Sequence, residues 1–162
     1  MIVTDNTDAN WWRGTNHRGE GLFPAHLVMR VELRSALLRA AKVGDERVVE
    51  LLLQHKDIEV NVADFHNSTP IGLAAEFGHH KVVEQLLEKT SAEFINKADN
   101  DGDYPLTMAG RGGHERVVEL LLRHPQIDLK VSDSYGRTAL ERARFMGNTK
   151  LIKLLNDKKS GK

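Results

Sequence analysis

Apolar and polar positions follow the same order four times along this chain of 162 residues. Each block has a pair of small residues, then a glycine, then a ladder of branched apolar residues interrupted by charged ones. The glycines stand 34, 35 and 34 residues apart, at Gly44, Gly78, Gly113 and Gly147. A period of this length predicts a solenoid of stacked repeats, a class of fold that serves mainly as a binding surface.

Each block predicts two short helices joined by its glycine. The first helix carries the small pair, which lets neighbouring helices approach closely: Ala40-Ala41, Ala74-Ala75, Ala109-Gly110 and Ala143-Arg144. The second helix carries an apolar stripe that must be buried, in ladders that begin at Val48, Val82, Val117 and Leu151. The glycine supplies the left-handed residue that ends the first helix.

Start and turn signals precede the first helices. Threonine caps a helix and proline tolerates the first helical position, and the aligned starts are Thr69-Pro70, Tyr104-Pro105, Thr138-Ala139 and, more weakly, Ser35-Ala36. Turn residues that accept a positive φ precede three of these starts, at Asn67, Gly102 and Gly136, and aspartates lie upstream at Asp64, Asp99 and Asp133. Segments such as residues 58–61 are predicted to be short extended fingers, and the finger near Ala92 is one residue longer.

This pattern resembles the ankyrin repeat, here as Ser68-Thr69-Pro70-Ile71-Gly72-Leu73-Ala74-Ala75 followed by Gly78-His79 and Val82-Val83. The resemblance implies a mainly α fold, an ankyrin-repeat solenoid of four helix-turn-helix repeats at about 33–64, 65–99, 100–133 and 134–156, with a polar tail at 157–162. A histidine common in the family is replaced by Leu38, Gly72, Thr107 and Glu141, which implies the loss of a local hydrogen bond.

Residues 1–31 do not fit the period. They contain Trp11-Trp12-Arg13-Gly14 and Gly21-Leu22-Phe23-Pro24, and short alternating runs split at residues 16–19 predict a tight β-hairpin. The segment resembles the C-terminal half of a Src-homology-3 (SH3) domain, particularly those of endosomal sorting adaptors, with the Gly-Leu-Phe-Pro step before a last strand. The resemblance implies a groove for proline-rich peptides that Trp11 walls and Pro24 floors, with Leu27 where an aromatic residue is usual.

Half a barrel cannot bury its face alone, which leaves three interpretations of this segment. The chain is a fragment or a truncated gene model, or the segment is a structured cap on the first repeat, or it regains a barrel by pairing with another chain. We expect the chain alone to bind proline-rich peptides poorly.

Composition narrows the function classes. Acidic and basic residues number 23 each, so we expect no nucleic-acid partner. The chain has no cysteine, no apolar run long enough to span a membrane and no secretory signal at its start. These features predict a soluble, cytoplasmic protein without disulfides, and we expect a monomer.

The sequence offers little catalytic chemistry. His79 and His80 point apart on a helix, and His79 and His114 follow inter-helix glycines, a position that favours histidine in the resembled family. Phosphate-loop, Gly-x-Ser-x-Gly and His-Glu-x-x-His motifs are missing, so we expect no enzyme, no metal and no cofactor. The ankyrin resemblance implies a candidate site of asparagine hydroxylation at Asn61, with Leu53 eight residues before it, and the alternative is a hydrogen-bonding finger residue.

Ankyrin repeats bind proteins through finger tips and first helices, which assigns a binding face by resemblance. The expected binding residues are exposed apolar and charged side chains just before the glycines and at the tips: Val43, Phe65, Phe77, Arg111, Tyr135 and Met146. The alternative is that Phe77 and Phe145 pack against neighbouring repeats.

SH3 followed by ankyrin repeats is the layout of small signalling adaptors. We therefore expect a non-enzymatic adaptor that binds a protein partner and, if the SH3 part is completed, proline-rich ligands. The alternatives are an endosomal sorting scaffold and a bare ankyrin binding module with a non-functional SH3 remnant.

Overall fold

The computed structural model describes residues 11–16 and 19–161, and their side chains from residue 29 onward. Two strands come first and helices follow: β1 (Trp11–Asn16), β2 (Gly19–Pro24), α1 (Ala25–Val43), α2 (Glu46–Leu53), α3 (Pro70–Glu76), α4 (His80–Leu87), α5 (Ala92–Ile95), α6 (Pro105–Gly112), α7 (Glu115–Leu121), α8 (Ala139–Phe145) and α9 (Thr149–Lys159). The described part of the chain is therefore mainly helical.

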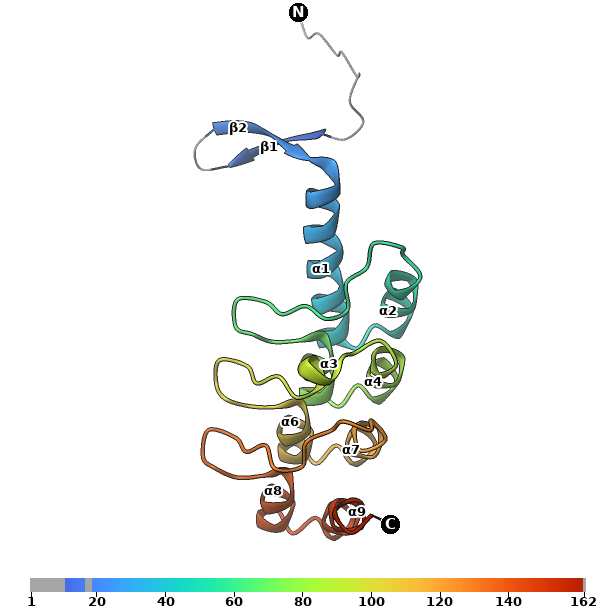
Figure 1. Cartoon of the computed structure of the whole chain (residues 1–162), viewed down its shortest axis with the longest axis vertical. Helices are drawn as coiled ribbons and strands as arrows, with labels where there is room; N and C mark the ends of the chain where they lie inside the picture. Colours follow the sequence, from blue (N-terminus) through green and yellow to red (C-terminus); the bar gives the residue numbers. More distant parts are fainter. Residues whose placement is uncertain (1–10, 17–18, 162) are drawn as a thin grey trace, which may run out of the picture.

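The helices form two layers (Figure 1). The inner layer contains α1, α3, α6 and α8, and the outer layer contains α2, α4, α7 and α9. After each of the first three outer helices the chain runs out in a finger on the same side of the inner layer. We name these fingers one, two and three by their tips, residues 64–68, 99–103 and 133–137, and we call the surface made by the fingers and the inner helices the finger face.

The inter-helix glycines have the predicted conformation. Gly44, Gly78, Gly113 and Gly147 all have φ between 67° and 78°. A Cβ atom on Gly78 would lie 2.6 Å from the His114 ring, so the histidine of the next repeat occupies the space that glycine leaves. The His114 Nε2 atom lies 2.9 Å from the carbonyl oxygen of Glu76, so this histidine also links two repeats.

Most predicted helix starts are confirmed. The hydroxyl of Thr69 accepts a hydrogen bond from the Gly72 N–H at 3.0 Å. At two positions where the family histidine is missing, another side chain supplies a bond. The Thr107 hydroxyl accepts from the Tyr104 N–H at 2.8 Å, and the Glu141 carboxylate accepts from the Thr138 N–H at 2.7 Å. The expected loss of a local hydrogen bond is therefore wrong at Thr107 and Glu141.

The first repeat differs from the prediction. Ser35 does not start a helix, because α1 already begins at Ala25 and runs through it. No glycine or proline interrupts residues 25–43, and the flanking leucine, arginine and glutamate residues favour helix. The segment after Pro24, implied to be a last strand, is the start of α1, which crosses the expected boundary near residue 32.

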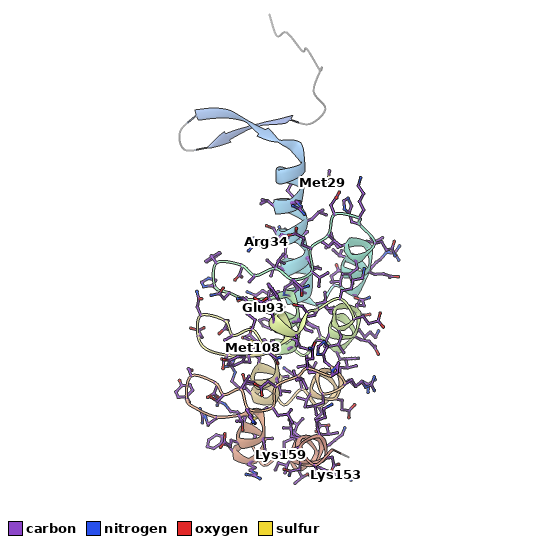
Figure 2. All side chains as sticks on the ribbon, viewed as in Figure 1. Met29, Arg34, Glu93, Met108, Lys153 and Lys159 are labelled. Carbon is purple, nitrogen blue, oxygen red and sulfur yellow. The ribbon has the colours of Figure 1, made fainter. Side chains whose placement is uncertain are left out.

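An antiparallel strand pair precedes α1, and the second finger contains an additional short helix. β1 and β2 pair antiparallel, with Trp11 opposite Pro24 and Asn16 opposite Gly19, at the N-terminal end of α1 (Figure 1). Near Ala92, the chain forms the one-turn helix α5, which Ser91 caps, in place of an extended segment. Met29 lies on the part of α1 that extends beyond α2, whereas Lys153 and Lys159 lie on α9 at the opposite end of the stack (Figure 2).

The core lies between the two layers and between successive repeats. Leu37, Ile71 and Leu106 from the inner helices are at most 1% exposed, as are Val83 and Val118 from the outer helices. Burial of these apolar side chains is the main favourable contribution to the free energy of folding, because a single repeat cannot cover its own apolar face.

Candidate protein-binding face

One aspartate organises the tip of each finger. One carboxylate oxygen of Asp64 accepts hydrogen bonds from the N–H groups of His66 and Ser68 at 2.8 and 2.9 Å. The same oxygen of Asp99 and of Asp133 accepts from the residues two and four positions on. Asn67, Gly102 and Gly136 have the predicted positive φ, so all three tips share one fixed turn.

Fingers one and two are joined through Asn100. Its backbone N–H donates to the His66 carbonyl at 2.8 Å, and its side-chain amide donates to the Phe65 carbonyl at 3.0 Å. Its side-chain oxygen accepts from the Asn67 amide at 2.6 Å. In finger three the aligned residue is Ser134, and no hydrogen bond joins tips 99–103 and 133–137 in the described structure.

Asparagines also link the bases of the fingers. Asn61 accepts a hydrogen bond from the Ser91 N–H at 2.8 Å and donates to the Lys89 carbonyl at 3.4 Å. Asn96 makes the same kind of pair with Asp128 and Gln126 in the next repeat. These contacts favour the hydrogen-bonding interpretation of Asn61.

The apolar residues predicted for the binding face are exposed. Val43, Phe77 and Met146, at the C-terminal ends of inner helices, are 65%, 46% and 50% exposed. Phe65 and Tyr135, at finger tips, are 85% and 75% exposed.

The alternative for the two phenylalanines holds only in part. Phe77 stacks on His79 of its own repeat at 6.2 Å between ring centroids, and it contacts the preceding repeat through the Lys42 ammonium, 5.9 Å from the ring centre; the side chain stays half exposed. Phe145 is 78% exposed and does not pack into a neighbouring repeat.

Arg111 is occupied within the fold. Its guanidinium pairs with Asp103, the last residue of the tip of finger two, and lies 3.8 Å from Glu76 of the preceding repeat. The Asp103 side chain is only 7% exposed, so this pair ties α6 to its own finger.

A groove of about 450 Å³ opens between fingers one and two and the inner helices α1 and α3. Leu38 and Leu73 supply apolar side chains, and Arg39, Lys42 and Glu76 line its helical side. Each finger contributes its tip to the other wall.

At the fourth repeat the structure brings together a cluster that the sequence did not predict. Asp133, 1% exposed, pairs through its second carboxylate oxygen with Arg142. The Arg137 guanidinium lies over the Tyr135 ring at 4.8 Å and over the Phe145 ring at 5.7 Å. We call these five residues the arginine–aromatic cluster. The sequence does contain a sign of this cluster, because the finger position occupied by Ser68 and Asp103 in the other two fingers is an arginine, Arg137, in finger three.

The electrostatics of the cluster favour the ionised carboxylate. Burial raises the pKa of Asp133, but hydrogen bonds from the Arg137 N–H, the Arg142 side chain and the Tyr135 N–H outweigh it. The pKa of Asp133 is therefore below its ordinary value.

The structure does not test the peptide site predicted for residues 1–31. Trp11 and Pro24 lie on the paired strands and Leu27 lies in α1, but their side chains are outside the described residues, so the proline-rich peptide site stays a prediction. Within residues 11–16 and 19–161, no group of three metal-ligating side chains comes together. No helix of the described chain is long and apolar enough to cross a membrane.

The paired helices, left-handed glycines and finger face define a repeat solenoid with a lateral binding surface. A family model for ankyrin repeats (3 copies) matches residues 22–97 and 90–161. The chain therefore belongs to the ankyrin-repeat family.

The chain is similar in sequence to proteins named osteoclast-stimulating factor 1. Those from Danio rerio, Bos taurus and Sus scrofa are 31%, 32% and 30% identical to this chain over 95 residues. Each alignment covers 57% of this chain and 44% of the relative, so the chain matches less than half the length of these proteins.

Proposed function

We propose that this chain is a non-enzymatic protein-interaction adaptor whose finger face binds a protein partner. The observation that carries the proposal is the set of exposed apolar side chains on one face: Val43, Phe65, Phe77, Tyr135 and Met146. Large apolar side chains that are held in place yet left in water are the residues that dominate protein–protein affinity. The hydrogen-bonded finger tips hold two of them on a fixed turn.

The test removes apolar contacts from the face without disturbing the core. The double variant Phe77→Ala, Met146→Ala is compared with wild type in pull-downs from cell extract, after thermal melting has shown equal stability. Leu51→Ala is the matched control, because Leu51 is 58% exposed and lies on the outer helix α2. We expect the double variant to lose partner capture by about tenfold or more and the control to keep it. Undiminished capture by the double variant would contradict the proposal.

A role in cytoplasmic signalling and a second binding surface belong to the same proposal. The SH3 resemblance of residues 1–31 and the similarity to osteoclast-stimulating factor 1 support an adaptor that brings proline-rich ligands close to a second partner. An endosomal sorting scaffold is the alternative that the SH3 resemblance itself favours.

For these 162 residues we expect only weak binding of proline-rich peptides, since residues 1–31 resemble only the C-terminal half of an SH3 domain. Calorimetric titration with a proline-rich peptide measures this directly. Micromolar affinity that disappears in Trp11→Ala would show a working groove and overturn the expectation.

A further inference from the structure

In the arginine–aromatic cluster, the guanidinium of Arg137 makes only one ion-pair contact with the rest of the described structure. Arg142 takes the second oxygen of Asp133, and the first oxygen is filled by two backbone N–H groups. Arg137 is left with a single contact to that carboxylate, 3.8 Å from its Nε atom. Within residues 29–161 the buried Nε atom finds no hydrogen-bond acceptor.

Two aromatic rings flank this guanidinium. The Arg137 Cζ atom lies 4.8 Å from the centre of the Tyr135 ring and 5.7 Å from that of Phe145, and the Arg137 side chain is 31% exposed. Because Nε is buried, the donors that remain for a ligand are the two terminal nitrogens, which form a pair that matches a carboxylate. Such a group loses little further freedom when an acceptor arrives.

The charge of the neighbourhood defines what fits. Arg137 and Arg142 share one carboxylate, Asp133. A further acid on α8, Glu141, is committed to the helix start through Thr138 and interacts with the charge of Arg144. The end of the finger face at finger three and α8 therefore carries a surplus positive charge beside exposed apolar rings and Met146.

We propose that this end of the finger face binds an acidic peptide segment of a partner protein, with an aspartate or glutamate side chain on Arg137 and an adjacent apolar side chain on Phe145 and Met146. The proposal rests on the proposed function, because it names the chemistry of the partner for the same face. The positive charge of Arg137 favours an acidic side chain in the peptide, and the exposed Phe145 ring and Met146 thioether favour an apolar side chain next to it.

The experiment uses the full chain and a defined probe. A phage-displayed random-peptide library is selected on the immobilised protein, and the enriched peptides are synthesised with amidated C-termini. Their affinities are then measured by calorimetry for wild type, Arg137→Gln and Arg137→Lys. Arg123→Gln is the control, because Arg123 is exposed and follows the outer helix α7.

We expect the selected peptides to contain an aspartate or glutamate next to an apolar residue. Arg137→Gln should weaken binding by about tenfold or more, Arg137→Lys should fall between, and Arg123→Gln should bind as wild type. Changing the peptide acid to its amide should weaken binding to wild type by a similar factor and change nothing for Arg137→Gln, which is the coupling that a direct contact requires.

The possible outcomes distinguish failure of the acidic-peptide proposal from failure of the proposed protein-binding function. Peptides that lack acids, or that bind Arg137→Gln as tightly as wild type, overturn the inference. If such peptides still lose affinity in the Phe77→Ala, Met146→Ala variant, the finger face remains a binding surface. Binding that needs a free C-terminal carboxylate also overturns the side-chain assignment, and a selection that yields no binder counts against both proposals.

Discussion

At the scale of single residues, Asp133 serves two structural tasks with two oxygens. One oxygen organises the finger tip, as in Asp64 and Asp99, and the other neutralises Arg142 in the interior. The first task follows from the sequence, because aspartates at the finger period predict a capped turn. The second does not, since it depends on where the side chain of Arg142 arrives in three dimensions.

Replacing Asp133 by asparagine keeps an acceptor for the tip but removes the charge that faces Arg142. We expect Asp133→Asn to lower the free energy of unfolding by about 2–4 kcal/mol at neutral pH, because a buried arginine loses its partner. The exposed Asp101→Asn is the control, with an expected change within about 0.5 kcal/mol. Urea unfolding of both variants measures this, and equal losses would contradict the role assigned to Asp133.

The depressed pKa of Asp133 gives this prediction a pH dependence. Because the folded-state pKa lies below the unfolded value of about 3.9, the ionised group stabilises the fold above that pH. This stabilisation is lost as the pH falls through the folded-state pKa. The difference between wild type and Asp133→Asn should therefore be largest near neutral pH and shrink in acid, whereas a pH-independent difference would speak against the ionised pair.

At the scale of helices and turns, the sequence predicts most of the elements. The glycines at the repeat period end the inner helices, and Thr69 and Thr138 begin two of them, because these are local backbone requirements. The sequence failed where no local requirement applies. No residue between Ala25 and Ser35 stops a helix, so α1 begins ten residues before Ser35.

Gly78 and Gly147 separate two reasons for a glycine. Both have a left-handed backbone, but a Cβ at Gly78 would collide with the His114 ring, whereas nothing lies within 4 Å of one at Gly147. We expect Gly147→Ala to cost about 1–2 kcal/mol, the backbone term alone, and Gly78→Ala about 2–4 kcal/mol. Chemical denaturation of the two variants gives the comparison, and equal costs would mean that the His114 ring moves aside freely.

At the scale of the whole molecule, position in the stack decides what a side chain does. Residues 46–53 and 115–122 have the identical sequence Glu-Arg-Val-Val-Glu-Leu-Leu-Leu. Yet Leu51 is 58% exposed in α2 and Leu120 is 1% exposed in α7, because α7 has a preceding repeat against it. No local reading of the sequence could separate the two segments.

This pair gives a prediction in which the local sequence is held constant. We expect Leu120→Ala to lower the free energy of unfolding by about 2–5 kcal/mol and Leu51→Ala by less than about 1 kcal/mol. Equilibrium unfolding followed by circular dichroism measures both. A large loss for Leu51→Ala would reveal that another part of the protein covers α2 in solution.

The hydrogen bonds of Asn100 bear on the heat and entropy of recognition. Fingers one and two are already fastened together, so a partner that touches Phe65 orders little additional chain. Finger three has Ser134 in that place, and in the described structure no hydrogen bond joins its tip to finger two. Asp133 fixes the turn within that tip, but a partner that touches Tyr135 restricts movement of the tip as a whole. The two ends of one surface should therefore differ in calorimetric signature, with the more unfavourable binding entropy at finger three.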